Sequence, residues 1–311
     1  MSLAVSVITP TRNRAPVLAR CLHHLAAQSL PPDRYEVLVV DDASTDETRA
    51  VVETAARDAR PPIRAFWLRD RMGVPGARNH AIREARGDVL VFVDSDNLAP
   101  PAFLQAHLAI HETHPAAVGR GPVILTRSLE RPFAARGSIL DLSTAYFDTD
   151  NASVRRAHLL RVGLFDEIFY PYGWEGLDLG FRLRALGLRR IYRRDAALFH
   201  YHEEVSPESL AGLLTKEEER ARTAWLFYEK HPTLEARLAL QFTPFHLALN
   251  GAQRLFGLVR PDNVEAWVRR ADRSGAPGLG RLLLSGVLNA RYLAHLHANA
   301  HVRPHARTDG D

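Results

Sequence analysis

Four short apolar runs in the first hundred residues constrain the fold of this chain more than any other feature. We expect each run to be a buried strand, and the runs lie at residues 5–8, 36–40, 63–68 and 89–93. Segments with helical spacing separate these runs, at residues 15–29, 44–57 and 77–86. This alternation predicts a Rossmann-like α/β fold, with a mostly parallel sheet flanked by helices. In such sheets, ligands bind at the carboxyl ends of the strands.

The rest of the chain is less regular and finishes in helices. We expect a helix at 102–113, a strand at 117–125, a polar site-lining segment at 147–154, a helix at 176–186, and strands near Ile191 and at 197–200. Beyond Ser206 the pattern predicts helices only, including 208–230, 264–272 and 279–296, with linkers at 257–261 and 275–280. The second part of the chain is therefore expected to be a helical extension.

The amino-acid composition limits the classes of protein to which this chain can belong. With 46 % hydrophobic and 24 % charged residues, the chain resembles ordinary soluble globular proteins. Its single cysteine, Cys21, excludes a disulfide framework and favours a reducing compartment. The absence of an apolar signal or membrane-spanning stretch predicts a cytoplasmic protein. Residues 233–311 hold ten arginines and six acids, which equals the net charge of +4. The main domain is then nearly neutral, which argues against a nucleic-acid groove.

Acidic residues follow two of the predicted strands. Asp41 and Asp42 end the second strand, where a carboxylate can accept hydrogen bonds from a base or ribose. Alternatively, these two aspartates have only a structural role, in a turn or as a helix cap. Asp94 and Asp96 follow the fourth strand, and such a pair can hold a divalent cation together with phosphate oxygens. The cation would neutralise a departing diphosphate.

Two further groups carry candidate chemistry. Glu175 and Asp178 lie three residues apart at the start of a predicted helix, and so on one helix face. A carboxylate there can take a proton from an acceptor hydroxyl, or it can serve only to stabilise the helix N-terminus. His200 and His202 follow a short apolar strand, and either can supply a metal ligand. We expect at most one of the two histidines to face the site.

Together these segments resemble the family 2 glycosyltransferases, whose catalytic domain has the GT-A fold. The resemblance covers residues 3–205 and rests on ordered motifs: Val5-Ser6-Val7-Ile8-Thr9-Pro10-Thr11-Arg12-Asn13, Val39-Val40-Asp41-Asp42-Ala43-Ser44-Thr45-Asp46, Gly76-Ala77-Arg78-Asn79, Asp94-Ser95-Asp96, Asn151-Ala152-Ser153-Val154-Arg155-Arg156 and Val162-Gly163-Leu164-Phe165-Asp166-Glu167. It implies a catalytic domain at 1–205, with a nucleotide-binding half at 1–100 and an acceptor-binding half at 101–205. The helical extension would occupy 206–311.

The resemblance implies an activity and a set of site residues. The activity is the inverting transfer of a sugar from a nucleotide diphosphate sugar, first of all a UDP-sugar, to a hydroxyl of a glycan or lipid-linked acceptor. The implied cofactor is Mn²⁺ or Mg²⁺, held directly by Asp96, with Asp94 and His200. The residues implied at the nucleotide are Thr9, Pro10, Thr11, Arg12, Asp41, Asp42, Arg78, Asp94 and Ser95. Those implied at the sugar and acceptor are Asn151 and Trp174.

One departure from the family pattern concerns the catalytic base. Many members carry Glu-Asp after the Gly-Trp, and the aspartate of that pair is the base. Here the pair reads Glu175-Gly176, so the aspartate is missing. We expect Glu175 to take over because its side chain is nearest and one methylene longer. Asp178 is the alternative base, although it is expected to brace the helix or an arginine.

Other functions remain open. A non-catalytic nucleotide-sugar-binding module is favoured only by Gly176. A sugar-nucleotide pyrophosphorylase would need a glycine-rich basic loop after the first strand, where residues 9–13 contain neither glycine nor lysine. A dehydrogenase would need a Gly-x-Gly-x-x-Gly motif after that strand, which is absent.

The last predicted helix carries a wide apolar surface, formed by Leu282, Leu283, Leu284, Val287, Leu288, Tyr292, Leu293 and Leu296. We expect this surface to pack against the catalytic domain or against a second subunit in a homodimer. Peripheral contact with the inner, anionic face of a membrane is the alternative, because the same region is rich in arginine.

Overall fold

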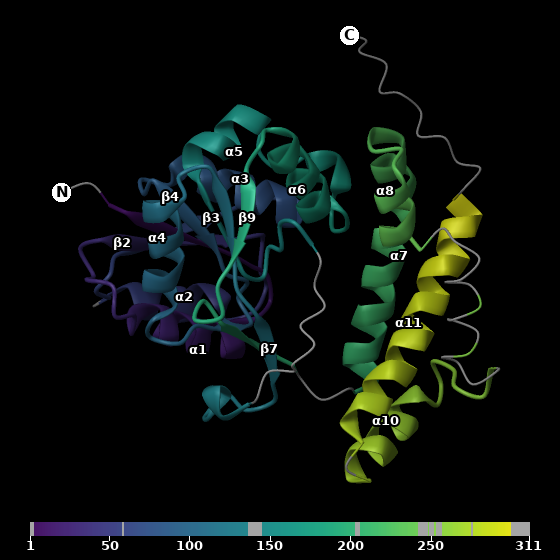
Figure 1. Ribbon diagram of the computed structural model, residues 1–311. Helices are drawn as coiled ribbons and strands as arrows, with labels where there is room; N and C mark the ends of the chain where they lie inside the picture. The colour runs from purple at the N-terminus through teal and green to yellow at the C-terminus, as the bar shows by residue number, and fades with distance from the viewer. Residues whose placement is uncertain are drawn as a thin grey trace. The chain divides into compact units, whose positions relative to one another are not determined.

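A computed structural model describes residues 3–57, 59–135, 145–202, 206–241, 248, 252, 257–274 and 276–299. The chain divides into two compact units. The first comprises Met1–Pro171 with Glu175–Glu203, and the second comprises Tyr172–Trp174 with Glu204–Asp311. The first unit contains the strands, and the second is helical (Figure 1). Among the described residues, no helix is long and apolar enough to cross a membrane.

A seven-stranded sheet forms the centre of the first unit. Its strands are β1 (Val5–Thr11), β2 (Tyr35–Asp41), β3 (Ile63–Trp67), β4 (Val89–Phe92), β6 (Ala117–Arg120), β8 (Ala152–Arg155) and β9 (Arg189–Tyr192). Their spatial order is β3-β2-β1-β4-β8-β6-β9. Strand β8 is antiparallel to both of its neighbours, whereas the other pairs are parallel. The predicted mostly parallel α/β sheet is confirmed.

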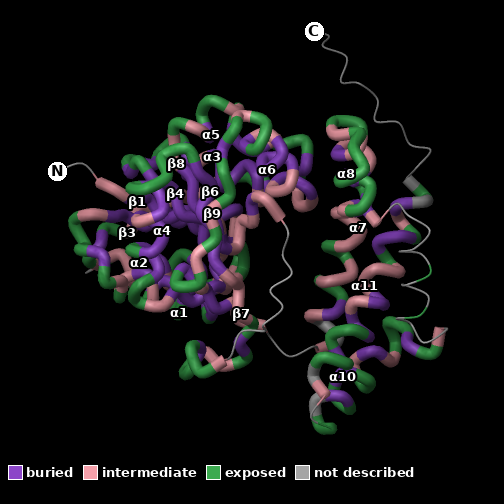
Figure 2. Tube along the Cα trace, viewed as in Figure 1, coloured by how far each residue is buried: buried purple, intermediate pink, exposed green. Residues whose placement is uncertain are grey.

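Helices cover both faces of this sheet, as Figure 2 shows by the buried strands between exposed helical surfaces. The helices of the first unit are α1 (Ala15–Ala26), α2 (Thr48–Arg57), α3 (Gly73–Glu84), α4 (Phe103–Thr113), α5 (Arg156–Val162) and α6 (Glu175–Ala185), with short 3₁₀ turns η1 (Pro132–Ala134) and η2 (Glu167–Phe169). Alternate strand residues enter different cores: Val7 packs with α1, α2 and α4, and Ile8 packs with α3, α5 and α6. Two apolar layers therefore hold the sheet rigid from both sides.

A second, three-stranded sheet lies beside the first and corrects one prediction. Strand β7 (Val123–Thr126) is parallel to β10 (Leu198–Tyr201), which pairs antiparallel with β5 (Asn97–Leu98). The single strand expected at 117–125 is wrong, because the chain changes sheets between β6 and β7. Gly121 sits at the crossing, where an added Cβ would lie 1.8 Å from the carbonyl oxygen of Ala196. Only glycine allows so close an approach of two backbones.

The helix expected from residue 44 begins instead at Thr48. Ser44, the first residue of the expected helix, uses its hydroxyl to accept a hydrogen bond from the Asn13 amide at 2.9 Å. Asp46 supplies the cap, since its Oδ1 accepts from the Thr48 amide at 3.1 Å. Its Oδ2 accepts from the Ala15 amide at 3.2 Å, at the start of α1. One carboxylate therefore serves two helix N-termini, which the local sequence pattern did not indicate.

Three other predicted boundaries also differ from the structure. Helix α1 ends at Ala26, before Ser29, and α3 begins at Gly73, before Ala77. The linker expected at 275–280 is too long, because α11 begins at Pro277. Proline suits the first turn of a helix, where its missing N–H is not needed.

The second unit consists of α7 (Pro207–Lys230), α8 (Leu234–Ala239), α10 (Val264–Arg273) and α11 (Pro277–Asn299). Helices α7, α10 and α11 enclose a core of their own, formed by Leu210, Val259, Val264, Val268, Leu283, Leu284 and Val287. Most of the predicted apolar surface of α11 is thus buried within this unit, and Leu282 is an exception at 47 % exposure.

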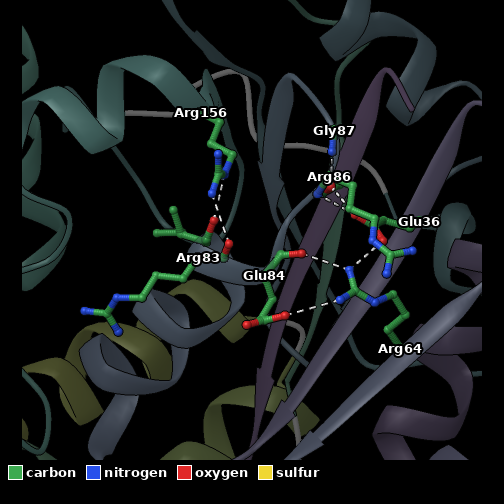
Figure 3. A network of polar contacts seen from close by, with 9 residues as sticks. Glu36, Arg64, Arg83, Glu84, Arg86, Gly87 and Arg156 are labelled. Carbon is green, nitrogen blue, oxygen red and sulfur yellow. Dashed lines mark hydrogen bonds and ion pairs between the residues drawn. The ribbon is translucent and has the colours of Figure 1, made fainter. Parts of the chain in front are cut away.

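A buried carboxylate ties the amino-terminal ends of the strands together (Figure 3). Glu36 is 1 % exposed and accepts hydrogen bonds from the Ser6 hydroxyl at 2.7 Å and the Arg86 amide at 2.8 Å. The guanidinium of Arg64 completes the cluster at 3.0 Å and also donates to the carbonyl of Glu84. This cluster lies at the end of the sheet opposite to the predicted ligand-binding edge.

Candidate functional site

The carboxyl ends of β1, β2 and β4 bring the first predicted acids to one edge of the sheet. Asp41 is the last residue of β2, and the Asp42 amide donates to the carbonyl of Thr11 at the end of β1. Asp94 follows β4 at a distance of two residues. Strand β1 pairs with both β2 and β4, so these ends are neighbours in the sheet.

The end of β1 carries the residues predicted to border a nucleotide. Thr9 and Thr11 are buried, and within the described residues their hydroxyl oxygens have no hydrogen-bond partner. Pro10 lies between them in the strand, and Arg12 is exposed just beyond it. A buried hydroxyl without a protein partner is unusual, and a bound ligand or water is one way to satisfy it.

Both aspartates at the end of β2 also organise the loops around them. Asp42 accepts from the amides of Met72 at 2.6 Å and Gly73 at 3.0 Å. Gly73 has φ +70°, and an added Cβ would lie 2.8 Å from the carbonyl oxygen of Pro171. Asp41 accepts from the amide of Ser44 at 3.2 Å. A carboxylate has about four acceptor positions, so these bonds leave room for a ligand.

The predicted metal ligands Asp96 and His200 face each other. His200 Nε2 lies 3.6 Å from Asp96 Oδ2, while strand β10 holds His200 opposite Asn97. Burial opposes the charged forms of both groups, but their mutual attraction prevails: the pKa of Asp96 is lowered, and that of His200 is raised to about 9. Arg14 adds a weaker contact to Asp96 at 3.9 Å. His200 is therefore a histidine that contacts Asp96, and the ring of His202 lies beside it, with the two ring centroids 6.1 Å apart.

Asp150 is a member of this group that the sequence reasoning missed. Its Oδ2 lies 3.8 Å from His200 Nδ1. Burial raises the pKa of Asp150 well above its usual value, and the nearby charges of Asp94 and Asp148 raise it further. A usable signal was present, because Asp148 and Asp150 form a second Asp-x-Asp within the segment predicted to line a site.

Arg78 joins the two halves of the predicted site, and its side chain is only 2 % exposed. Its Nη2 donates to Asp94 Oδ1 at 2.8 Å, and its Nη1 donates to Glu175 Oε1 at 3.2 Å. The sequence predicted Arg78 at the nucleotide, and the structure places it between the acid after β4 and the acid that begins α6. Its charge compensates both carboxylates in a setting where water screens weakly.

The two candidate bases occupy different surroundings. Asp178 is fully buried, and its Oδ2 accepts two hydrogen bonds from Arg182, at 2.9 and 2.7 Å. Glu175 lies at the N-terminus of α6 beside Arg78. An added Cβ at Gly176 would lie 3.3 Å from the methyl carbon of Thr149, so the 148–150 segment lies against the position of the missing aspartate.

The remaining predicted site residues are buried. Asn151 is fully buried, and its amide donates to the carbonyls of Pro122 at 3.1 Å and Ala196 at 2.8 Å. Trp174 belongs to the helical unit, where its indole stacks on Phe227 at 5.6 Å. Ser95 is 7 % exposed between the two acids that follow β4.

A divalent cation fits the donor set at Asp96 and His200 only if further ligands come from outside the protein. Within the described part of the chain, no group of three or more His, Cys, Asp or Glu side chains is arranged to hold a metal. Two facing donors, an oxygen and an imidazole nitrogen 3.6 Å apart, can nevertheless share one ion. Mg²⁺-type sites commonly use one or two carboxylates, with substrate phosphates and water as the other ligands.

Comparison with known proteins gives a consistent family match. Residues 6–166 match the family model described as glycosyl transferase family 2. A validoxylamine A glucosyltransferase of Streptomyces hygroscopicus subsp. jinggangensis is 30 % identical over 308 residues, covering 86 % of this chain and 69 % of that protein. The uncharacterized glycosyltransferase YfnE of Bacillus subtilis is 28 % identical, covering 80 % of this chain and 74 % of that protein.

Solved structures confirm the predicted GT-A fold. The mannosyltransferase PcManGT of Pyrobaculum calidifontis, in complex with GDP-Man and Mn²⁺, superposes with a TM-score of 0.60 at 20 % identity, over 94 % of this chain and 88 % of that one. The S. aureus protein TarS (residues 1–349), in complex with UDP-GlcNAc, gives a TM-score of 0.54 at 20 % identity, over 98 % and 93 % of the two chains.

Proposed function

Since the chain belongs to glycosyl transferase family 2, we propose that this glycosyltransferase moves a sugar from a nucleotide diphosphate sugar to an acceptor hydroxyl with inversion. The observation that carries the proposal is the position of Arg78, which connects Asp94 of the strand-end acids to Glu175 of α6. The buried Arg78 side chain thereby links an acid proposed to bind the donor to a carboxylate suited to proton transfer.

Asp96 and His200 would hold the divalent cation, Mn²⁺ or Mg²⁺, with Asp94 next to them. The bound cation supplies neutralisation of the diphosphate charge that develops as the nucleotide departs. The chemistry of the donor set supports this assignment, because oxygen and imidazole ligands suit both ions. The complexes of PcManGT with Mn²⁺ and of GalNAc-T7 with Mn²⁺ point the same way.

The nucleotide would lie across the carboxyl ends of β1 and β2, as in other open α/β sheets. Asp42 and the buried hydroxyls of Thr9 and Thr11 offer hydrogen-bonding groups there. We propose a UDP-sugar as the donor, supported by the UDP-GlcNAc complex of TarS. The GDP-Man complex of PcManGT makes GDP-sugars the first comparison in any screen.

Glu175 is the proposed base. In the transfer, the acceptor oxygen forms a bond to the anomeric carbon, the bond from that carbon to the diphosphate oxygen breaks, and Glu175 takes the acceptor proton. The guanidinium of Arg78 lies 3.2 Å from the Glu175 carboxylate, so a cation faces the proposed base. Asp178 suits the role poorly, because one of its oxygens already accepts two hydrogen bonds from Arg182.

Substitution of Glu175 tests this assignment. We expect Glu175→Gln to lower turnover about 10²–10⁴-fold, the usual contribution of general-base catalysis, without weakening nucleotide binding. Asp178→Asn is the matched control on the same helix, and we expect a smaller loss of turnover together with lower thermal stability. Release of the free nucleotide in the presence of Mn²⁺ measures turnover. Unchanged turnover in Glu175→Gln would remove this residue from the role, and binding without any turnover in the wild type would favour a non-catalytic module.

For the acceptor we propose a glycan or lipid-linked molecule at an anionic membrane surface, supported by exposed residues near the start of α11. Leucines exposed by 47–66 % accompany exposed arginines: Leu258, Leu279 and Leu282 with Arg260, Arg270 and Arg281. Apolar side chains interspersed with arginine suit an anionic lipid surface.

Sedimentation with vesicles of phosphatidylglycerol or phosphatidylcholine tests the membrane contact. We expect binding to the anionic vesicles only, and weaker binding in high salt. The double substitution Leu279→Ser/Leu282→Ser should abolish binding, whereas Leu234→Ser, at an even more exposed leucine of α8, should not. Protein that stays in the supernatant at low salt would refute the contact, and self-association lost in the double variant would favour a homodimer instead.

A further inference from the structure

Four buried polar side chains, His107, His111, Ser153 and Asn151, form a hydrogen-bonded line. His107 and His111 lie one helical turn apart on α4, and both are fully buried although histidine is polar. Their partners are Ser153 of β8 and Asn151, which are also fully buried. Buried polar groups of this kind lower stability unless each is hydrogen-bonded, so the contacts among them are informative.

The contacts define one consistent direction of donation. Asn151 donates its amide to two backbone carbonyls, so its Oδ1 accepts from His107 Nε2 at 2.9 Å. His107 Nδ1 must then be the acceptor for the Ser153 hydroxyl at 2.8 Å. Ser153 in turn accepts from His111 Nε2 at 2.8 Å. Each histidine in this arrangement is neutral, and burial lowers the pKa of His107 to about 4.

At the Asn151 end, the hydrogen-bonded line connects to backbone segments that carry residues of the proposed cation site. The carbonyl of Pro122, which accepts from Asn151, also accepts from the amide of Leu198, the first residue of β10. Strand β10 carries His200. On the other side, the residue before Asn151 is Asp150, whose carbonyl accepts from Asn97 at 3.2 Å. Asn151 is therefore hydrogen-bonded to the backbone that leads into β10 and His200, and it directly follows Asp150 in the chain.

Close packing leaves this arrangement little freedom. An added Cβ at Gly119 would lie 2.4 Å from Ser153 Oγ and 3.5 Å from His107 Nδ1. An added Cβ at Gly121 would meet the same Ala196 carbonyl that Asn151 holds. The surrounding backbone thus encloses Ser153, His107 and Asn151 tightly and leaves little empty space around these three residues.

We propose that His107, Ser153 and Asn151 are positioning residues for the cation site, which set the spacing of Asp150 and His200 around Asp96. The inference rests on the proposed function, because it concerns the same site. Groups that orient the ligands of a metal without touching it typically change metal affinity about 10–100-fold when they are removed. The expected effect therefore falls on metal affinity, beyond the loss of stability that any buried substitution causes.

Two histidines of equal burial on one helix provide the experiment. Only His107 contacts Asn151, whereas His111 contacts Ser153. Binding of Mn²⁺ alone is measured by electron paramagnetic resonance for the wild type, His107→Leu and His111→Leu, with thermal unfolding of each protein. We expect both variants to lose similar stability. His107→Leu should bind Mn²⁺ about tenfold more weakly, and His111→Leu should stay within about twofold of the wild type.

A conservative variant separates positioning from general damage. His107→Gln keeps a donor for Asn151, and we expect it to recover most of the Mn²⁺ affinity. Equal affinities in the two leucine variants, or no recovery in His107→Gln, would refute the inference while leaving the proposed function intact. A wild-type protein that binds neither Mn²⁺ nor any nucleotide sugar would refute the proposed function, and this inference with it.

Discussion

Replacing Arg78 with methionine should expose how strongly the site depends on one buried cation. Arg78 compensates Asp94, whose side chain is 29 % exposed, and Glu175, whose side chain is 4 % exposed. Asp94 can be rehydrated when the guanidinium is lost, whereas Glu175 is left as a buried charge. Removing one partner of a buried ion pair costs about 3–5 kcal/mol, and the partial exposure of Asp94 favours the lower figure of about 3 kcal/mol.

This loss is large enough to measure by thermal unfolding. For a unit of this size, about 1 kcal/mol corresponds to about 2–4 °C, so Arg78→Met should melt about 6–12 °C below the wild type. Circular dichroism at pH 7 measures the transition. Adding Glu175→Gln removes the buried charge that faced Arg78, so the double variant should recover part of the loss and show a coupling energy of about 1–3 kcal/mol.

A surface pair gives the matched control for Arg78. Arg193 and Asp195 form an ion pair with side chains about half exposed, and such pairs contribute about 0–1 kcal/mol. Arg193→Met should therefore melt within about 4 °C of the wild type. A melting temperature of Arg78→Met as close to the wild type as that of the control would refute the reasoning, as would a double variant less stable than either single one.

Two further predictions concern pH and the opposite end of the sheet. Burial lowers the pKa of His107 to about 4 and that of His111 to about 3, so the unfolded chain binds protons first as the pH falls below about 6.5. For each histidine, the free energy of unfolding should then decrease by about 1.4 kcal/mol per pH unit as the pH falls from 6.5 to 4. Urea titrations of the double variant His107→Gln/His111→Gln should show a weaker dependence of this free energy on pH. Glu36→Gln should lower the unfolding free energy by about 1–3 kcal/mol, because Ser6 and Arg64 lose a charged acceptor, and its nucleotide-sugar affinity should equal that of the wild type. A pH-independent stability, or a change in donor affinity in Glu36→Gln, would contradict these expectations.

The central sheet was predictable because four of its strands are short apolar runs, two of which are followed by acids. Periodicity of apolar residues fixed the order of strands and helices, and the parallel arrangement followed from their alternation. The same reasoning placed Asp41 and Asp94 at one edge, where the structure has them. Boundaries were less predictable, since Asp46 caps a helix across a loop and the Gly121 crossing depends on a distant carbonyl.

The side-chain contacts within the candidate site were much harder to predict from the sequence. Asn151 and Trp174 were expected to line the acceptor site, and their side chains make internal contacts that only the folded chain reveals. Asp150 and the pairing of Arg78 with Glu175 depend on residues about 50 to 100 positions apart in sequence. Local patterns carry no record of such contacts, whereas a repeated Asp-x-Asp motif offered a hint of Asp150.

The affinity of a nucleotide sugar with and without Mn²⁺ tests directly whether Asp96 holds a cation that binds the donor. Isothermal titration would compare the wild type with Asp96→Asn, after a thermal-shift screen of UDP- and GDP-sugars has identified the donor that stabilises the protein most. We predict that Mn²⁺ strengthens donor binding at least about tenfold in the wild type and less than about twofold in Asp96→Asn. A donor affinity that is independent of Mn²⁺, or an undiminished effect of Mn²⁺ in Asp96→Asn, would contradict the proposed cation site.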